Sequence, residues 1–555
     1  MAANNRRAVQ IYDTTLRDGV QQEGLALTVA DKLAVARRLD AFGVDFIEAG
    51  WPGAVPLDTD FFQRAERELT LAHAQLAAFG ATRRPEGDAG NDPQIRALLD
   101  ARTPVVTLVA KSHDRHVEIA LRTTLAENLR MIRDSVRQLI AQGRRVFVDA
   151  EHFFDGYRAN RAYALAVAEA AIDAGAEKVV LCDTNGGTLP TQLAEIVAVA
   201  TERGLAVGIH CHDDAGCAVA NSLLAIGAGA GQVQGTANGY GERCGNANLF
   251  SVVANLVVKE GHELLSPAQL AGMARTAHEI GELAAAPVLS SAPYVGASAF
   301  AHKGGLHASA VRLDPSLYQH IEPERFGNRS RVLVSDLGGR SSIELKAREL
   351  GYTVRASDER VNRAMLRIKE LGRLGYAVES ADASFELLLR EHLADQPMPR
   401  VFDISAWWLS TSGSWDRSAT STRAVLRVDR DGRTVTTSGV ADEPVRALFQ
   451  ALCAALTPVV PGIEALELLD HESRPITTDD DGQPATRVLI RFGLGARAWR
   501  TVGVGRDLAA AALLALNDAA DYVLACGPAG APPALDRRRG EPRAQRTGAS
   551  SGAAG

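Results

Sequence analysis

The sequence predicts an α/β protein: a (β/α)8 TIM barrel, then a helical segment, then a C-terminal α+β domain. Eight strand-like apolar runs follow one another in the first half of the chain, spaced about 26 to 41 residues apart. Helical patterns lie between these runs, and nearly every run ends in polar residues, as barrel strands do at their carboxyl ends. A doubly wound open sheet is the alternative fold. No GxGxxG follows the first run, which counts against a dinucleotide-binding fold.

Strand and helix patterns alternate from residue 9 onward. The strands are predicted at Val9–Thr15, Phe46–Gly50, Gln75–Thr82, Val105–Lys111, Val146–Glu151, Lys178–Thr184, Ala206–His212 and Gln232–Asn238. Thr28 is predicted to cap the first helix, with Asp31 as its acidic partner and Gly43 at the helix end. A strand followed by a helix, repeated eight times, is the pattern of a closed parallel barrel.

The chain beyond Pro267 changes character twice. Helical patterns without strands come first, at Leu270–Ala285, Leu345–Leu350, Val361–Leu371 and Phe385–His392. From about residue 400 the chain becomes rich in strand patterns, and Thr422–Val428 is echoed by Thr486–Phe492. Each echo is followed by a second strand and a helix. We therefore predict two β-β-α units that pack as one module, whose residues suggest binding or association rather than chemistry.

These changes in pattern predict four parts of the chain. A barrel is expected over residues 1–265, a helical linker over 266–398 and the α+β module over 399–526. The remainder, 527–555, is made mainly of Gly, Ala, Pro and Arg and is expected to be disordered.

Composition narrows the function classes. The net charge of -7 offers no basic field for nucleic acid, and no apolar run reaches the roughly 20 residues that span a bilayer. The first residues lack the apolar core of a signal peptide. Six cysteines form no CxxC pair, so we expect reduced thiols in a cytoplasmic protein.

Polar residues in three stretches point to a metal site. His210 and His212 end a strand-like run and point the same way, because side chains alternate along a strand. A lone His-x-His is weak evidence, since two buried, hydrogen-bonded histidines would look the same. The stretches Asp13–Gly19 and Gly239–Asn248 also follow strand-like runs, and both offer oxygen ligands. Together the three stretches favour a divalent cation.

Three of these features, Asp13–Gly19, His210-x-His212 and Gly245-Asn246, together resemble the acyl-CoA-condensing barrel enzymes. That family includes the 2-isopropylmalate, homocitrate and citramalate synthases. The resemblance covers the chain up to about residue 525 and is greatest to the bacterial (R)-citramalate synthase branch. It rests on the stretches Glu48–Gly53, Asp149–Tyr157, Leu181–Gly187, Gly239–Asn248 and His302–His307. The related hydroxymethylglutaryl-CoA lyases are a poorer match, because such a chain would end at the barrel.

The resemblance implies a set of site residues. The implied metal ligands are Asp18, His210, His212 and Asn246, holding Mn²⁺, Mg²⁺, Zn²⁺ or Co²⁺. The implied substrate-binding residues are Arg17, Thr184 and Gln21, and Arg17 would also stabilise a developing alkoxide. Glu151, His307 and Tyr318 would manage proton transfer, with the identity of the base left open. An ion pair between Glu151 and a neighbour such as Arg17 is the structural alternative for that carboxylate, and it is compatible with the catalytic role.

The resemblance also implies a reaction and its control. Acetyl-CoA would condense with pyruvate, and thioester hydrolysis would release citramalate and CoA on the way to isoleucine. The implied partners are a second copy of the chain, in a homodimer with shared active sites, and isoleucine as a feedback inhibitor. Two alternatives stay open: a 2-isopropylmalate synthase acting on 2-oxoisovalerate, and a catalytically silent barrel with a regulatory role.

Overall fold

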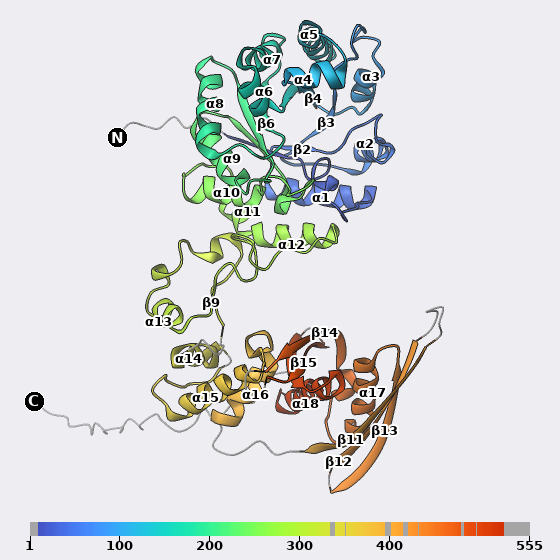
Figure 1. The fold of residues 1–555 in the computed structure, drawn as a ribbon, viewed down its shortest axis with the longest axis vertical. Helices are drawn as coiled ribbons and strands as arrows, with labels where there is room; N and C mark the ends of the chain where they lie inside the picture. The colour runs from blue at the N-terminus through green and yellow to red at the C-terminus, as the bar shows by residue number, and fades with distance from the viewer. Residues whose placement is uncertain are drawn as a thin grey trace, which may run out of the picture. The chain divides into compact units, whose positions relative to one another are not determined.

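The computed structural model describes residues 9–333, 339–349, 351–393, 401–413, 420–430, 432–478, 482–495 and 497–526. The chain forms two compact units (Figure 1). The first contains Met1–Phe300 and Glu322–Ser330, and the second contains Ala301–Ile321 and Arg331–Gly555. The predicted disordered tail, 527–555, lies outside the described residues.

The first unit is a closed barrel of eight parallel strands (Figure 1). The strands are β1 (Gln10–Asp13), β2 (Phe46–Glu48), β3 (Gln75–Ala81), β4 (Val105–Lys111), β5 (Arg145–Glu151), β6 (Lys178–Asp183), β7 (Val207–Cys211) and β8 (Gln232–Gly235). β1 pairs with both β2 and β8, which closes the sheet. The barrel prediction is confirmed, and because all strands run the same way, their carboxyl ends share one rim.

Helices surround the barrel, as the sequence predicts. They are α1 (Val29–Phe42), α2 (Pro56–Glu68), α3 (Pro93–Asp100), α4 (Asp114–His116), α5 (Leu125–Ala141), α6 (Phe153–Ala159), α7 (Arg161–Asp173), α8 (Pro190–Glu202), α9 (Ala218–Gly227) and α10 (Leu249–Val258). The predicted cap of α1 is present: Thr28 and Asp31 form a reciprocal capping box, and Gly43 ends the helix with a positive φ of 103°.

Aromatic side chains fill part of the barrel interior. Tyr12, Phe46 and Phe147 are buried together with Ala77 and Val105. The Phe46 and Phe147 rings meet edge to face with centroids 5.1 Å apart, and Tyr12 lies 5.6 Å from Phe46. The interior is therefore a packed core rather than a channel, and chemistry is confined to the rim.

Two further helices complete the first unit. The predicted helix Leu270–Ala285 is observed as α11 (Pro267–Ala271) and α12 (Met273–Leu283), separated at Gly272. Both pack on α1 of the barrel. The apolar face of α12, with Met273, Ala277 and Ile280 buried, explains this packing.

The second unit begins with helices and two short strands. The helices are α13 (Gly305–Leu313), α14 (Arg340–Glu349), α15 (Glu359–Arg373) and α16 (Asp382–Leu393), and the strands β9 (Ala301–His302) and β10 (Arg331–Val332) pair with each other. The predicted helices after residue 340 coincide with α14, α15 and α16. Their apolar faces form one cluster around Ile343, Ile368 and Phe385.

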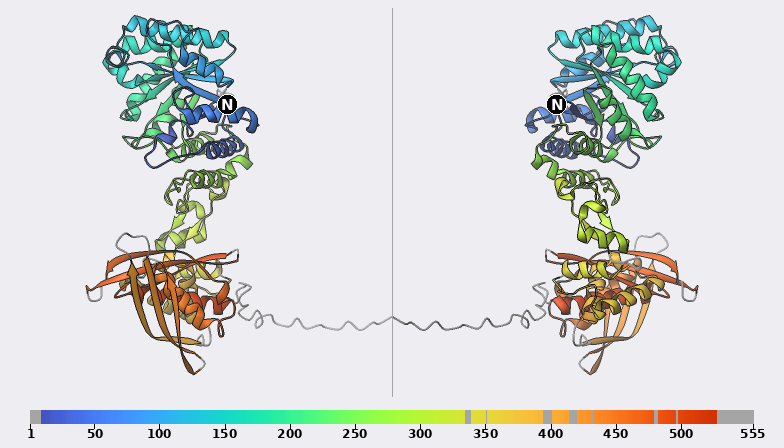
Figure 2. Two further views of the ribbon diagram at one scale, coloured as in Figure 1. Left: turned by 90° about the vertical axis from the view of Figure 1, so that its right-hand side faces the viewer. Right: turned by 90° about the vertical axis from the view of Figure 1, so that its left-hand side faces the viewer.

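Two three-stranded antiparallel sheets, each followed by a helix, come next in the described part of the second unit (Figure 2). The first has β11 (Phe402–Gly413), β12 (Thr420–Arg430), β13 (Arg433–Ala441) and α17 (Pro444–Leu456). The second has β14 (Glu467–Thr477), β15 (Pro484–Leu494), β16 (Arg497–Gly505) and α18 (Leu508–Cys526). The sequence predicts the last two strands and the helix of each unit. It misses β11 and β14, because most of their side chains are partly or fully exposed and the apolar alternation is weak.

The last helix, α18, is long and apolar enough to cross a membrane by length and composition alone. In the structure it packs against β15 and β16. Its residues Ala512, Leu516 and Val523 are buried in the same core as the strands. The apolar composition of α18 is therefore explained by its place in the core of the C-terminal module.

Candidate active site

A cavity of about 330 Å³ opens at the carboxyl ends of the barrel strands. The residues that line it are Arg17, Asp18, Gln21, Trp51, Phe79, Val109, Lys111, Asp149, Glu151, Cys182, Thr184, His210, His212, Glu242 and Arg243. Seven of the residues singled out from the sequence are among them: Arg17, Asp18, Gln21, Glu151, Thr184, His210 and His212. The remaining barrel candidate, Asn246, is described below with His212.

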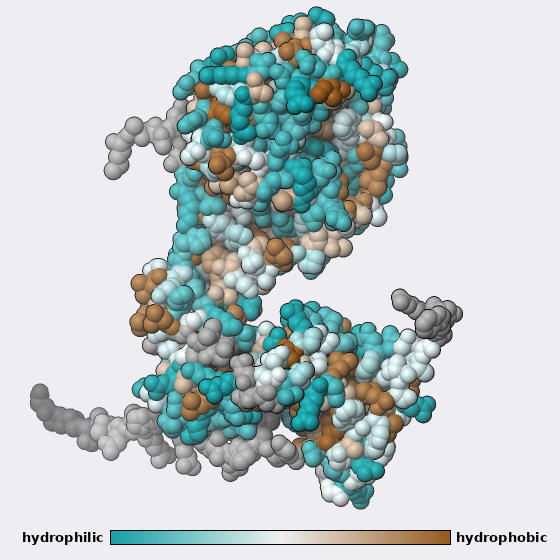
Figure 3. Space-filling view, in the orientation of Figure 1, coloured by the Kyte–Doolittle hydropathy of each residue, from teal (hydrophilic) through white to brown (hydrophobic). Residues whose placement is uncertain are grey.

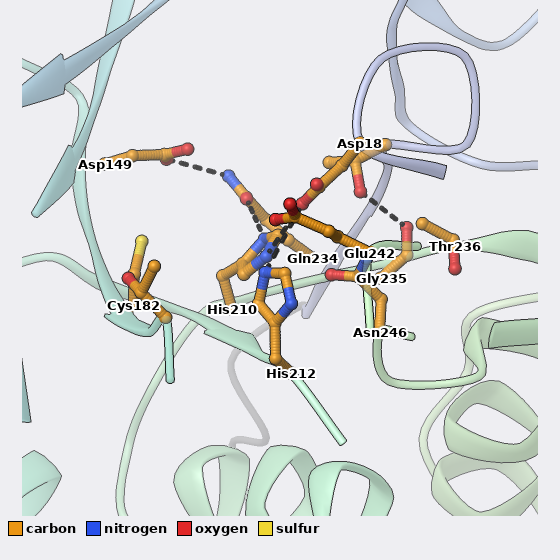
Figure 4. A network of polar contacts seen from close by, with 12 residues as sticks. Asp18, Asp149, Cys182, His210, His212, Gln234, Gly235, Thr236, Glu242 and Asn246 are labelled. Atoms are coloured by element: carbon orange, nitrogen blue, oxygen red, sulfur yellow. Dashed lines mark hydrogen bonds and ion pairs between the residues drawn. The ribbon is translucent and has the colours of Figure 1, made fainter. Parts of the chain in front are cut away.

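Three of the predicted metal ligands meet at one point (Figure 4). Asp18 Oδ2 lies 3.2 Å from His210 Nε2 and 3.6 Å from His212 Nε2. One ligand atom from each residue falls within 4.8 Å of the others, and all three residues are buried. Two imidazole nitrogens and a carboxylate converging in this way are suited to a divalent transition-metal ion.

The electrostatics of the cluster favour the ligand forms of Asp18 and His212, whereas at His210 burial is outweighed by the hydrogen bond to Asp18 and its charge, which raise the pKa. Burial alone would raise the pKa of Asp18, but the charge of Arg17 and the hydrogen bond from His210 hold it well below its usual range. Burial lowers the pKa of His212 to about 4, so its imidazole is neutral at physiological pH. A carboxylate and a neutral imidazole are the forms that bind a cation.

Asn246 supplies a fourth candidate ligand. It lies directly across a β-bridge from His212, and its Nδ2 donates to the Tyr240 carbonyl oxygen at 3.1 Å. Among the described residues nothing hydrogen-bonds to its buried Oδ1. A buried acceptor without a donor is costly, and a cation would satisfy it. The four predicted ligands therefore fit a metal ion.

Glycines make this approach of Asn246 possible. Gly241 has φ of 154°, and a side chain there would collide with Asn246 Nδ2. Gly245 has φ of 90°, and a side chain there would collide with the Gly239 carbonyl oxygen. Only glycine tolerates both the backbone conformation and the contact. The glycines of this predicted motif thus shape the loop that presents Asn246.

A buried hydrogen-bond relay behind His210 was not predicted from the sequence. His210 Nδ1 lies 2.9 Å from Gln234 Oε1, and Gln234 Nε2 donates to Asp149 Oδ1 at 3.1 Å (Figure 4). The amide oxygen of Gln234 can accept a proton on Nδ1, so Nε2, which faces Asp18, is the nitrogen that would bind a cation. Burial raises the pKa of Asp149 to about 7. Gln234 is the last residue but one of β8, and a polar residue near the end of a buried strand was the signal that the sequence offered.

Arg17 is fixed beside the cluster of Asp18, His210 and His212. Its Nε donates to Glu48 Oε1 at 2.6 Å, and its Nη1 lies 3.6 Å from Asp18 Oδ1. The guanidinium carbon sits 4.0 Å from the centre of the Phe79 ring. Glu48 is fully buried and also accepts from the Tyr12 hydroxyl at 2.7 Å. Arg17 is therefore held rigidly at the cavity wall.

Glu151 forms its ion pair with Lys111, not with Arg17. The ion pair that the sequence offered as the structural alternative is therefore present, but its partner is Lys111 and not the example given, Arg17. The cause is strand register: β4 and β5 place Lys111 and Glu151 side by side at their last residues. Arg17, in the turn that follows β1, pairs with Glu48 instead.

Thr184 and Gln21 reach the cavity from two other loops. The Thr184 hydroxyl oxygen accepts from the His152 backbone N–H at 2.8 Å, so its own proton is available to donate. Gln21 is exposed at the end of a short 3-10 helix, Gly19–Gln21.

Arg243 links two of the loops at the cavity through hydrogen bonds. It binds both carboxylate oxygens of Asp214 at 2.8 and 2.9 Å, and donates to the Thr184 carbonyl oxygen.

His307 and Tyr318 lie in the second compact unit. Their rings contact each other with centroids 4.2 Å apart and planes tilted by 30°, and both side chains are exposed. Their predicted part in the barrel chemistry stays a prediction.

Comparison with known proteins gives three consecutive family matches. Residues 8–278 match the family described as HMGL-like, and 294–375 match the homocitrate synthase post-HMGL domain-like family. Residues 379–524 match the LeuA allosteric (dimerisation) domain. A barrel with this ligand cluster, followed by these two domains, defines a synthase of the HMGL-like class.

Full-length relatives narrow the class. The (R)-citramalate synthase of Streptomyces coelicolor is 53% identical over 93% of this chain and 96% of its own length. That of Aquifex aeolicus is 44% identical over 93% of this chain and 98% of its own. The 2-isopropylmalate synthase of Pyrococcus furiosus is 31% identical, over 92% and 99%. The chain belongs to the (R)-citramalate synthase family, and it is an acyltransferase of the acyl-CoA-condensing type.

Proposed function

We propose that the chain condenses acetyl-CoA with pyruvate and hydrolyses the resulting thioester, giving (R)-citramalate and CoA. Family membership sets the reaction class. The observation that carries the proposal is the convergence of Asp18, His210 and His212 beside Arg17 in one cavity. This arrangement suits a 2-oxo acid, which offers adjacent carbonyl and carboxylate oxygens to a cation and to hydrogen-bond donors.

Asp18, His210, His212 and Asn246 would hold the metal ion, which we propose is Mn²⁺, Mg²⁺, Zn²⁺ or Co²⁺. A divalent ion there supplies Lewis-acid polarisation of the ketone. Two nitrogen and two oxygen ligands leave open positions for a chelating substrate and do not separate these four ions by themselves.

Arg17 and Thr184 would bind the 2-oxo acid. Arg17 carries a fixed positive charge next to Asp18, so its free N–H groups can stabilise negative charge that develops on the ketone oxygen. Thr184 can donate its hydroxyl proton to the carboxylate, because its oxygen already accepts from His152. Gln21, at the cavity mouth, would support this binding.

Glu151 faces the same cavity and would act in proton transfer with His307 and Tyr318. The acetyl methyl group must lose a proton before the new carbon–carbon bond forms, and a water molecule must later be activated to cleave the thioester. Because His307 and Tyr318 belong to the second unit, we propose that they act on the barrel of a partner copy in a homodimer.

Exposed apolar side chains near His307 and Tyr318 support the proposal that this part of the second unit contacts a partner copy. Brown, apolar atoms gather around the position of α13 (Figure 3). Leu306, Leu313 and Leu317 are 78%, 73% and 59% exposed, and they flank His307 and Tyr318 in the sequence. Surface leucines this exposed are typical of a segment that is covered in an assembly.

We further propose that isoleucine is the feedback inhibitor and that it binds the module that matches the LeuA allosteric (dimerisation) domain. An effector can act only if it favours one arrangement of the chain over another. Turnover of the intact protein should fall with rising isoleucine. Equal inhibition by valine, or none by isoleucine and leucine, would contradict this assignment.

We also propose that the protein is located in the cytoplasm.

The proposed substrate is tested by following release of the CoA thiol from acetyl-CoA with a panel of 2-oxo acids. Pyruvate should give a far higher kcat/KM than 2-oxoisovalerate. A preference for 2-oxoisovalerate would replace the proposal with a 2-isopropylmalate synthase. No turnover of any 2-oxo acid, with metal supplied, would favour the catalytically silent barrel.

A further inference from the structure

The ion pair of Lys111 and Glu151 is a second charged centre in the cavity, separate from the metal ligands. Both side chains line the cavity, and they are 26% and 24% exposed. The β4–β5 register puts the two residues opposite each other at the ends of their strands. Because the Lys111–Glu151 pair is partly exposed to the cavity, it can contact a bound molecule. A fully buried ion pair could not.

The backbone on both sides of this pair is held in place. Ser112 donates from its hydroxyl to the Glu151 carbonyl oxygen at 2.6 Å, and from its backbone N–H to the same oxygen at 3.2 Å. Asn128 donates from Nδ2 to the Lys111 carbonyl oxygen at 2.9 Å. Gly156 leaves room for the Ser112 carbonyl oxygen, which any side chain there would strike. The pair is therefore pre-positioned rather than a flexible surface contact.

Lys111 differs from the other cations that line the cavity. Arg17 is bound to Glu48 and lies beside the metal ligand Asp18, while Arg243 is bound by Asp214. The partner of Lys111 is instead the carboxylate proposed for proton transfer.

The imidazoles packed near the Lys111–Glu151 pair add no positive charge to it. His116 and His152 contact each other with ring centroids 4.2 Å apart. Burial lowers the pKa of both, so they are neutral at physiological pH. Among the described residues that line the cavity, Lys111 is the cation that pairs with Glu151.

We propose that Lys111 binds the carbonyl oxygen of the acetyl thioester and stabilises its enolate. The inference rests on the proposed function. In an acetyl group the carbonyl oxygen and the methyl carbon are attached to one carbon. A neighbouring ammonium donor and carboxylate acceptor can therefore contact both at once.

Formation of the enolate needs only Lys111 and Glu151, and its protons and electrons balance as follows. Glu151 takes a methyl proton, the C–H electron pair becomes the C=C bond, and the C=O π pair moves to oxygen. The ammonium of Lys111 keeps its protons and donates a hydrogen bond to the new oxyanion. When the methylene carbon attacks the ketone, the thioester C=O bond reforms and this charge moves to the ketone oxygen.

The test uses Lys111→Met, Lys111→Arg and Lys111→Ala in the full-length protein supplied with Mn²⁺. A matched control is Lys369→Met, the same change at an exposed position of α15. Lys111→Met should lower kcat for CoA thiol release by about 100- to 1,000-fold, the loss expected for one oxyanion donor. The Mn²⁺ Kd should change by less than about threefold, because Lys111 does not touch the ligand cluster. Lys111→Arg should recover part of the activity, and methylammonium should restore at least about tenfold to Lys111→Ala, since it returns the missing donor.

Two results would overturn the role of Lys111 alone: Lys111→Met with wild-type kcat, or loss of Mn²⁺ binding in parallel with kcat and no rescue by methylammonium. The second result would make Lys111 a structural residue. Failure of the proposed function is distinguishable, because it would appear as no CoA release by the wild-type protein with any 2-oxo acid, and it would remove this inference as well.

Discussion

Replacing Gln234 with methionine tests how the barrel interior prepares His210 for a metal ion. Gln234 is fully buried, accepts from His210 Nδ1 at 2.9 Å and donates to Asp149 Oδ1 at 3.1 Å. Methionine has a similar length and makes neither hydrogen bond. His210 could then carry its proton on Nε2, where it would block the lone pair that faces Asp18.

Two effects are expected in Gln234→Met: weaker metal binding and lower stability of the fold. Loss of the outer hydrogen bond to a metal-binding histidine weakens metal affinity by about 10- to 100-fold, or about 1.4 to 2.7 kcal/mol. The substitution also leaves two buried partners, His210 and Asp149, without their hydrogen bonds, at about 1 to 3 kcal/mol each. Calorimetric titration with Mn²⁺ measures the first effect, and urea unfolding of the metal-free protein measures the second.

Gln232→Met is the matched control. Gln232 lies two residues earlier on β8 and is also fully buried. Its Nε2 has only a long contact of 3.4 Å to Gln10, and within the described chain its Oε1 has no hydrogen-bond partner. This variant should keep the Mn²⁺ Kd within about threefold of wild type. Wild-type Mn²⁺ affinity in Gln234→Met, or equal weakening in Gln232→Met, would refute the relay.

Three further predictions concern ligands, assembly and acid stability. His212→Ala should lower Mn²⁺ affinity by more than about a hundredfold, a larger loss than that expected for an outer hydrogen-bond partner such as Gln234. The variant should retain the far-UV circular dichroism spectrum of the wild type. Unchanged affinity would remove His212 from the ligand set. Mixed Asp18→Ala and His307→Ala chains should regain activity after subunit exchange, and no recovery in verified mixed dimers would contradict shared sites. The hydrogen bond from Arg83 lowers the pKa of Glu127 to about 2, so this pair stabilises the fold above pH of about 4.5 and loses that effect as the pH falls toward 2. Glu127→Gln should therefore cost about 3 kcal/mol in urea unfolding at pH 7, with a gap that narrows below pH 4.5, and a constant gap would contradict the assignment.

Much of the barrel could be predicted because its strands are buried on both sides. Val105–Lys111 reads as a mostly apolar run that is interrupted at Thr107 and ends in a lysine, and the observed β4 has the same limits. His210 and His212 could be paired because alternate residues of a strand share a face. The parallel arrangement then brings Asp18, from the other end of the barrel sequence, to the same rim.

Other features depend on contacts that a linear pattern does not contain. The partner of Glu151 follows from the β4–β5 register, which places Lys111 beside it. Gln234 looked like an ordinary polar residue, because its role depends on His210 and Asp149 on other strands. β11 and β14 were missed because partly exposed strands carry little apolar alternation.

The most direct test of the central claim is CoA thiol release by metal-free protein as Mn²⁺ is titrated in, with acetyl-CoA and pyruvate both present. We expect no release without metal, a rise that saturates at one ion per chain, and loss of the signal when pyruvate is left out. Equal thiol release before and after metal addition would contradict a condensation that depends on Asp18, His210, His212 and Asn246.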